Sequence, residues 1–141
     1  METYSRQNVQ AAVEIITAAD LAVSGTPKNL FTKLPNGVIP VSMFTLIVTP
    51  FNPGTSTLLD IGHAAHGVVA ADPDAYFNDV DLEAVAGTRV AHAALPGLID
   101  TANGGLQLTA TPTTVGTAPT IGEARVVLLY VEDGVEHGVQ G

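Results

Sequence analysis

The sequence of 141 residues contains no cysteine and no tryptophan, and only 13% of its residues are charged. Without cysteine the chain can form no disulfide, cannot use a thiolate as a nucleophile and cannot build a cysteine-ligated zinc site. A chain of this length buries enough apolar surface to fold without such cross-links. Its stability is therefore expected to come from an apolar core. Apolar residues make up 46% of the sequence, enough to form one.

Positive charge is also scarce. Fourteen acidic residues stand against five basic ones, and the formal net charge is −9. The basic residues are Arg6, Lys28, Lys33, Arg89 and Arg125. Because proteins bind phosphate backbones mainly through lysine and arginine, this composition argues against a nucleic-acid partner and against an anionic membrane surface.

Long apolar segments are absent as well. No stretch approaches the roughly 18 apolar residues that a membrane helix needs, and the N-terminal sequence METYSRQNVQ lacks the apolar centre of a signal peptide. The length fits one domain. With so few charged residues, part of the surface is expected to be covered by partners, since exposed apolar patches on soluble proteins usually mark contacts.

The apolar residues recur with the period of two that is typical of β-strands. In residues 9–17 this alternation and the β-branched residues favour a strand, and a helix capped by Asn8 is the alternative for the same segment. Residues 38–49 hold the longest apolar run, with apolar side chains on both faces. Such a strand is covered on both sides, or it faces a partner subunit on one of them.

Further short strands are expected elsewhere, separated by turns rich in glycine and proline. They fall at residues 28–32, 55–61, 89–93, 106–111 and 126–131, with a further apolar run at 66–71. The last of these strands is apolar on both faces and should be central. Gly62 is expected to end a strand, and residues 72–83 and 111–120 are expected to form loops, the first of them acidic.

About eight short strands at regular spacing predict an all-β protein, an antiparallel β-sandwich or jelly roll with an extended N-terminal arm. The predicted domain covers residues 9–133, after a flexible arm at 1–8 and before a polar tail at 134–141.

Two clusters of side chains are candidates for binding metal ions. His63 and His66 could share a face of a helix, but Gly62 and Gly67 disfavour a helix, and no HExxH pattern is present. Residues 72–83 have carboxylates at some positions of a calcium loop, but the glycine that such a loop needs is replaced by Phe77. We therefore expect neither a metal nor another cofactor.

The sequence contains no catalytic motif either. The chain has no GxSxG nucleophile elbow and no phosphate-binding loop, so an enzyme is not expected.

Several segments resemble small virion proteins of tailed double-stranded DNA bacteriophages. They are TLIVTPFNPGTSTLLDIG at 45–62, PDAYFNDVDL at 73–82, AGT at 86–88 and LTATPTTVGTAPTIGEARVVLLYV at 108–131. Together they span most of residues 38–131 and look like head-associated proteins of the cement or decoration type. The resemblance implies a structural protein that binds the outer surface of the capsid, clamps neighbouring major capsid subunits and forms trimers.

The expected partners are therefore a major capsid protein and other copies of this chain, with a location on the virion. The residues proposed for these interfaces are Tyr4, Arg6, Phe51, Tyr76 and Phe77. Aromatic side chains are enriched at the centres of interfaces, although Tyr76 and Phe77 could equally fill the core. For Phe44 a core position is expected.

Three alternatives stay open: a head-spike base or tail component of the virion, a carbohydrate-binding β-sandwich, and a small cupin-type enzyme. The absence of tryptophan argues against a sugar-binding platform, and a cupin would need a His/Glu metal cluster.

Overall fold

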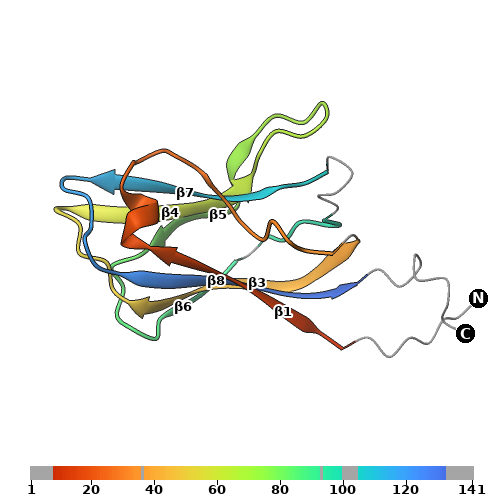
Figure 1. Ribbon diagram of the computed structural model, residues 1–141, viewed down its shortest axis with the longest axis horizontal. Coiled ribbons are helices and arrows are strands. Elements are labelled where there is room, and N and C mark those ends of the chain that lie inside the picture. Colours follow the sequence, from red (N-terminus) through yellow and green to blue (C-terminus); the bar gives the residue numbers. More distant parts are fainter. Residues whose placement is uncertain (1–7, 36, 93, 100–104, 133–141) are drawn as a thin grey trace, which may run out of the picture.

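The computed structural model describes residues 8–35, 37–92, 94–99 and 105–132. The predicted tail, and all of the predicted arm except Asn8, lie outside the described residues. Within them, eight strands form two four-stranded antiparallel sheets that pack face to face (Figure 1). The strands are β1 (Gln10–Thr17), β2 (Lys28–Asn29), β3 (Val38–Thr49), β4 (Ser56–His63), β5 (Asp72–Asp81), β6 (Arg89–Ala91), β7 (Leu108–Val115) and β8 (Glu123–Glu132). One 3-10 turn, η1 (Ala18–Leu21), follows β1.

The strand order identifies the topology. One sheet has the order β1-β8-β3-β6 and the other the order β2-β7-β4-β5. The pairs β1–β8, β2–β7, β3–β6 and β4–β5 are therefore nested, as if one long hairpin had been folded over into two layers. This is the arrangement of a jelly roll, and it confirms the predicted fold class.

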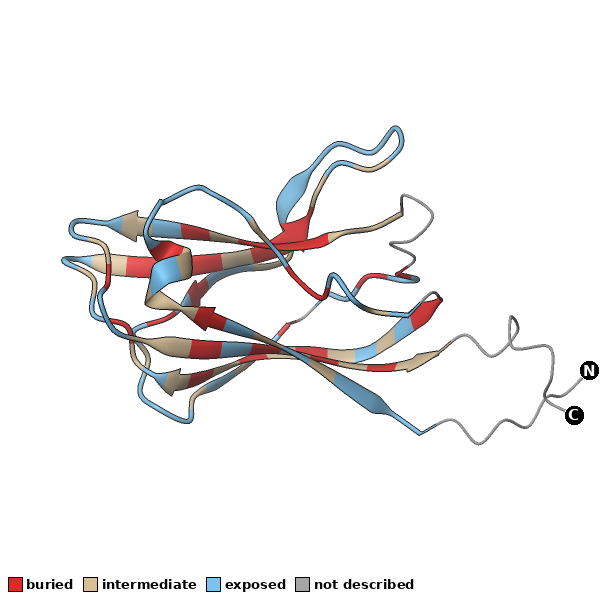
Figure 2. Ribbon diagram, in the orientation of Figure 1, coloured by how far each residue is buried: buried red, intermediate tan, exposed pale blue. Residues whose placement is uncertain are grey.

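The core lies between the two sheets. Along β4, buried and half-buried residues alternate from Ser56 to Ile61 (Figure 2). Along β8, every second residue from Ala124 to Tyr130 is buried, and the residues between them are half-buried or exposed. This is the pattern of strands with one face turned to the core. Residues 10–17 form a strand and not a helix, and β8 is an interior strand, as the apolar patterns predicted.

Three local expectations were wrong. Gly62 does not end β4: the strand continues to His63, which pairs with Leu108 of β7. Glycine stands at residue 62 because a Cβ there would strike the backbone of Asp72 and Pro73 on β5. A glycine inside a strand can mark such a close approach of two backbones.

The expected acidic loop at 72–83 is largely strand β5, which lies at the edge of its sheet. The expected loop at 111–120 is strand as far as Val115. Pro112 is tolerated there because its backbone faces away from β4, on the side where its carbonyl accepts a hydrogen bond from Gly25 N at 2.7 Å and where β2 has already ended.

In the described part of the chain, no helix is long and apolar enough to cross a membrane.

Candidate interaction surfaces

Of the five residues proposed for interfaces, the structure describes three, and these lie in different environments. Tyr4 and Arg6 lie outside the described residues. Phe51 is instead a core residue with 4% of its surface exposed, and its ring packs against the backbone of Gly122. It is held there because its N–H donates to the carbonyl of Leu82 at 3.0 Å, which ties the end of β3 to the end of β5. The Phe51 ring therefore packs inside the core of its own protomer.

Tyr76 and Phe77 on β5 are both half-buried and pack against the edge of the core. The ring of Phe77 lies 5.4 Å from that of His92, and the ring of Tyr76 lies 6.0 Å from that of His63. Burial raises the pKa of the Tyr76 phenol, and the nearby charge of Asp72 adds to the effect. Part of each ring remains exposed, so a contact role for Tyr76 and Phe77 stays a proposal.

The two histidines considered as metal ligands do lie together, with ring centroids 5.1 Å apart. Each places its Nδ1 near the carbonyl of Ala64, His63 at 2.9 Å and His66 at 3.2 Å. Among the described residues, no group of three or more histidine, aspartate or glutamate side chains is arranged to hold a metal ion.

The carboxylates of the acidic segment point to several separate partners. Glu83 accepts a hydrogen bond from Thr57 N at 3.0 Å, and Asp81 accepts one from Glu83 N at 2.9 Å. Asp74 lies against Asp72, and a side-chain hydrogen bond between the two raises the pKa of Asp74. Residues of a strand alternate between two faces, so β5 does not bend its carboxylates around one point as a calcium loop does.

The outer face of the β1-β8-β3-β6 sheet is mostly apolar. Direct partners in an antiparallel ladder point to the same side, so the exposed residues of β1 identify the rest of that face through their partners on β8 and β3. The outward apolar residues are Ala11, Val13, Ile15, Ile39, Phe44, Leu46, Val127, Leu129 and Val131. Phe44 belongs to this outer face and not to the core, contrary to expectation.

Two cations border the outer apolar face. The guanidinium carbon of Arg89 lies 4.6 Å from the ring centroid of Phe44, a cation–π arrangement. Arg125 is held by Glu123 in an ion pair of 2.9 Å. This face therefore combines an apolar centre with two of the five basic residues of the chain.

The opposite sheet has a polar outer face. Its register places Asp60 beside Thr111 and Leu58 between Thr113 and Asp81. The acidic side chains of β5 lie on the same sheet. The two outer faces of the sandwich thus differ: one is apolar with arginines, and the other is rich in threonine and aspartate.

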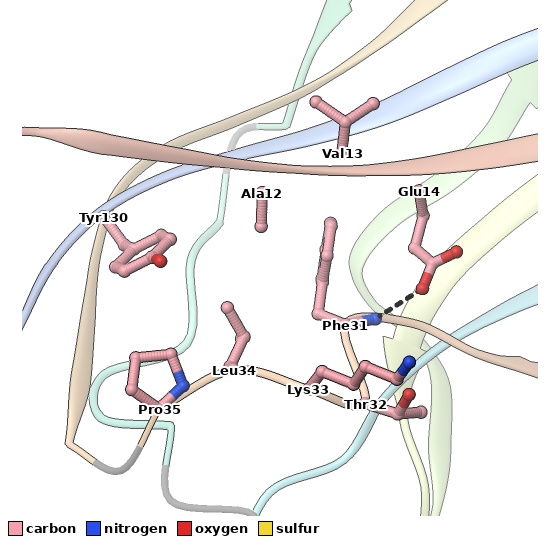
Figure 3. A pocket seen from close by; sticks show the side chains of 9 residues that line it. All are labelled: Ala12, Val13, Glu14, Phe31, Thr32, Lys33, Leu34, Pro35 and Tyr130. Atoms are coloured by element: carbon pink, nitrogen blue, oxygen red, sulfur yellow. Dashed lines mark hydrogen bonds between the residues drawn. The ribbon is translucent and has the colours of Figure 1, made fainter.

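A groove opens at the edge of the sandwich, between β1 and the segment of residues 31–35 (Figure 3). Its volume is about 400 Å3. Ala12, Leu34 and Pro35 line it, Tyr130 closes one end, and Lys33 lies on its rim. Tyr130 is held by a hydrogen bond from its hydroxyl to Gln10 Oε1 at 3.4 Å.

Sequence patterns indicated one of these surfaces and missed the other. The two apolar faces of residues 38–49 left open a partner on one side, and the structure shows that this side is the outside of the sandwich. The groove combines residues from β1, β8 and a loop, and no local pattern brings such distant segments together.

Comparison with solved structures identifies two chains with a similar fold. Neither a protein-family model nor a curated protein sequence matches the chain. Among solved structures, a chain of the cyanophage Pam1 capsid asymmetric unit matches with a TM-score of 0.63, covering 94% of this chain and 91% of that chain at 12% identity. A chain of the capsid of Ralstonia phage GP4 matches with a TM-score of 0.56, covering 89% of this chain and 85% of that chain at 20% identity. The shared fold extends over nearly the whole length of all three chains.

Proposed function

We propose that this protein is a structural component of a bacteriophage virion that binds the outer surface of the capsid and reinforces it, as cement and decoration proteins do. One observation carries the proposal: the jelly roll matches, over 94% of this chain, a chain found in a phage capsid asymmetric unit. The match to a second phage capsid and the resemblance of residues 38–131 to head-associated virion proteins support the same assignment.

The two outer faces of the sandwich suggest how the protein would sit on the shell. The outer apolar face would contact the major capsid protein, because burying apolar side chains drives association and because arginine is enriched in interfaces. The acidic face, with Asp60 and Asp81, would point to solvent. An acidic surface is repelled by packaged DNA, which favours the outside of the capsid.

The role needs no chemical step. A protein that binds the assembled shell and not its separated subunits stabilises the shell by mass action. If the protein forms a trimer, as we expect, each of its three copies adds a contact to the same shell. Weak individual contacts then add up to firm attachment.

The decisive experiment compares phage particles that carry this protein with particles that lack it. We expect the particles that lack it to release their DNA at lower temperature, and image reconstruction to place its density on the outside of the head. Equal heat stability would contradict the reinforcing role. Density at the tail, or beneath a head spike, would support the tail or spike-base alternative instead.

A further inference from the structure

We propose that the free edge of strand β1, together with the groove beside it, binds the N-terminal arm of a second copy of this chain as an added β-strand. The proposal concerns the free protein in solution and does not depend on a capsid partner.

The edge follows from the register of β1. β1 is the outermost strand of its sheet, and among the described residues it pairs only with β8. The carbonyl of Ile15 accepts a hydrogen bond from Lys28 Nζ at 3.1 Å, on the side away from β8. In an antiparallel pair, backbone groups alternate between the two sides of a strand. The N–H and C=O groups of Val13 and Ala11 therefore also point to the free side.

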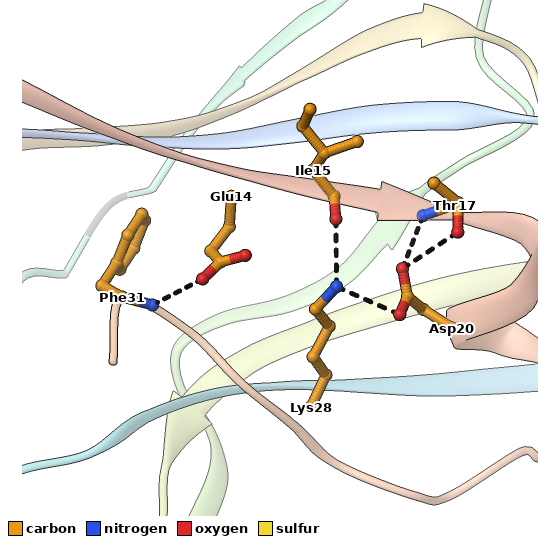
Figure 4. A network of polar contacts seen from close by, with 6 residues as sticks. All are labelled: Glu14, Ile15, Thr17, Asp20, Lys28 and Phe31. Atoms are coloured by element: carbon orange, nitrogen blue, oxygen red, sulfur yellow. Dashed lines mark hydrogen bonds and ion pairs between the residues drawn. The ribbon is translucent and has the colours of Figure 1, made fainter. Parts of the chain in front are cut away.

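Side chains of the described protomer cover only the C-terminal half of this edge. At its C-terminal end Lys28 bonds to Ile15 and forms an ion pair with Asp20 at 3.0 Å, and Asp20 accepts a hydrogen bond from Thr17 N at 2.8 Å (Figure 4). Next to it, Glu14 Oε1 accepts a hydrogen bond from Phe31 N at 3.0 Å.

The other half of the edge is open. Within the described ranges, nothing pairs with the edge-facing backbone groups of Val13 and Ala11. Such a row of unpaired groups is a template for another strand, and proteins use it to bind extended peptides.

The groove would receive the side chains of the added strand. Leu34, Pro35 and Tyr130 give it an apolar wall (Figure 3). Lys33 on its rim is exposed and forms no ion pair with any described residue. The groove therefore suits an extended peptide with an apolar or aromatic side chain next to an acidic one.

The sequence that precedes Asn8 has this pattern. Residues 1–7 read METYSRQ. In a strand Glu2, Tyr4 and Arg6 would share one face, with the Tyr4 ring available for the apolar wall and Glu2 for Lys33. Seven residues span about 23 Å when extended, more than the open edge requires. Opposite charge on Glu2 and Lys33 would fix the register of the added strand.

A second copy fits better than the arm of the same chain. To return along its own β1 edge, the arm would need a tight turn near Asn8. Such turns favour Asn-Gly or Asp-Gly, and the chain has Asn8-Val9, where a β-branched residue would have to adopt a positive φ. If each copy donates one arm and accepts one, the exchange closes into a ring, as a trimer requires.

Cysteine cross-linking of the full-length chain tests the proposal, because the natural sequence has no cysteine to interfere. Two single variants, Glu2→Cys and Lys33→Cys, are mixed and oxidised. We expect a disulfide-linked pair of chains, formed at least tenfold faster than with the control pair Glu2→Cys and Val68→Cys, since Val68 is fully exposed on the β4–β5 loop. A rate equal to the control would overturn the proposal. So would a Glu2→Cys/Lys33→Cys double variant that forms its disulfide only within one chain.

Three further single variants and one combination test the mode of binding. Val13→Pro removes an N–H that faces the free edge and no hydrogen bond to β8, so the fold should survive while the cross-link is lost. If Val13→Pro unfolds, exchanging the charges of Glu2 and Lys33 still tests the proposal. Glu2→Lys and Lys33→Glu should each weaken self-association roughly two- to fivefold, and their combination should restore it. Failure of the combined variant to recover would contradict the proposed register.

Discussion

The imidazole Nε2 of His92 lies 2.9 Å from the hydroxyl oxygen of Thr45, and both side chains are buried. His92 directly follows the edge strand β6, and Thr45 belongs to the neighbouring interior strand β3. The contact therefore ties the segment after the edge strand to the inside of the same sheet. The other ring nitrogen, Nδ1, has no hydrogen-bond partner among the described residues. A protonated ring would bury a second donor without an acceptor, which is unfavourable.

We predict that this histidine makes the fold sensitive to mild acid. Burial lowers the pKa of His92 from 6.5 to about 4. Well above pH 6.5 the ring is neutral in both the folded and the unfolded chain, and this contribution to stability is fully present. As the pH falls toward 4 the unfolded chain takes up the proton first, so the free energy of unfolding falls by up to about 3 kcal/mol. Denaturant titrations from pH 7 to pH 4 measure this loss.

His92→Gln should flatten that pH dependence, although it also lowers stability at pH 7. The control is His66→Gln, which changes a half-buried histidine outside the core. An unchanged pH profile in His92→Gln would assign the acid sensitivity to the carboxylates instead.

The close packing of Phe51 on Gly122 leads to a second prediction. Gly122 has φ +140°, and a Cβ there would collide with the Phe51 ring, whereas Gly25 has φ +80° and open space around it. Gly25→Ala should cost about 1 kcal/mol from backbone strain alone. Gly122→Ala should cost more, about 3 kcal/mol, because overpacking is added to strain. Thermal unfolding of both variants measures the difference, and equal losses would mean that the ring simply moves aside.

These contacts also show how far sequence patterns could lead. The alternation in residues 126–131 predicted a strand, and its two apolar faces placed it in the middle of a sheet. The same patterns could not separate a core face from an outer apolar face, so they misplaced Phe44, and they gave no sign that Phe51 fills the space beside a glycine 71 positions later. The acidic segment 72–83 predicts a loop and largely forms a strand, because an edge strand exposed on one side can be as polar as a loop.

The candidate groove was beyond sequence reasoning for a related reason. It depends on which strand lies at the edge and on which side of β1 the carbonyl of Ile15 points. Both facts are set by strand order and register, which nonlocal pairing decides and local composition does not.

The ion pair of Lys28 and Asp20 gives a third prediction. Partial burial alone would raise the pKa of Asp20, but hydrogen bonds from Thr17 and Lys28 outweigh it and hold the pKa below its usual value. The contribution of this carboxylate is therefore present above about pH 4 and is lost as the pH falls through its lowered pKa. A double-mutant cycle of Asp20→Ala and Lys28→Ala should give a coupling of about 0.5 kcal/mol at pH 7, because both groups are partly exposed.

The last prediction concerns the outer apolar face. Ile15 is 46% exposed on that face, and Val115, which is 51% exposed, belongs to the opposite sheet. Both positions tolerate a charge in the free protein, so Ile15→Glu and Val115→Glu should melt within a few degrees of the natural chain. If the outer apolar face binds the shell, Ile15→Glu should lower the occupancy on purified capsids at least tenfold, because binding would then have to remove a carboxylate from water in an apolar contact. Val115→Glu should bind like the natural chain. Co-sedimentation with capsids measures both. Loss of binding in Val115→Glu alone would reverse the orientation, placing the acidic sheet on the shell and the apolar sheet toward solvent or a further partner.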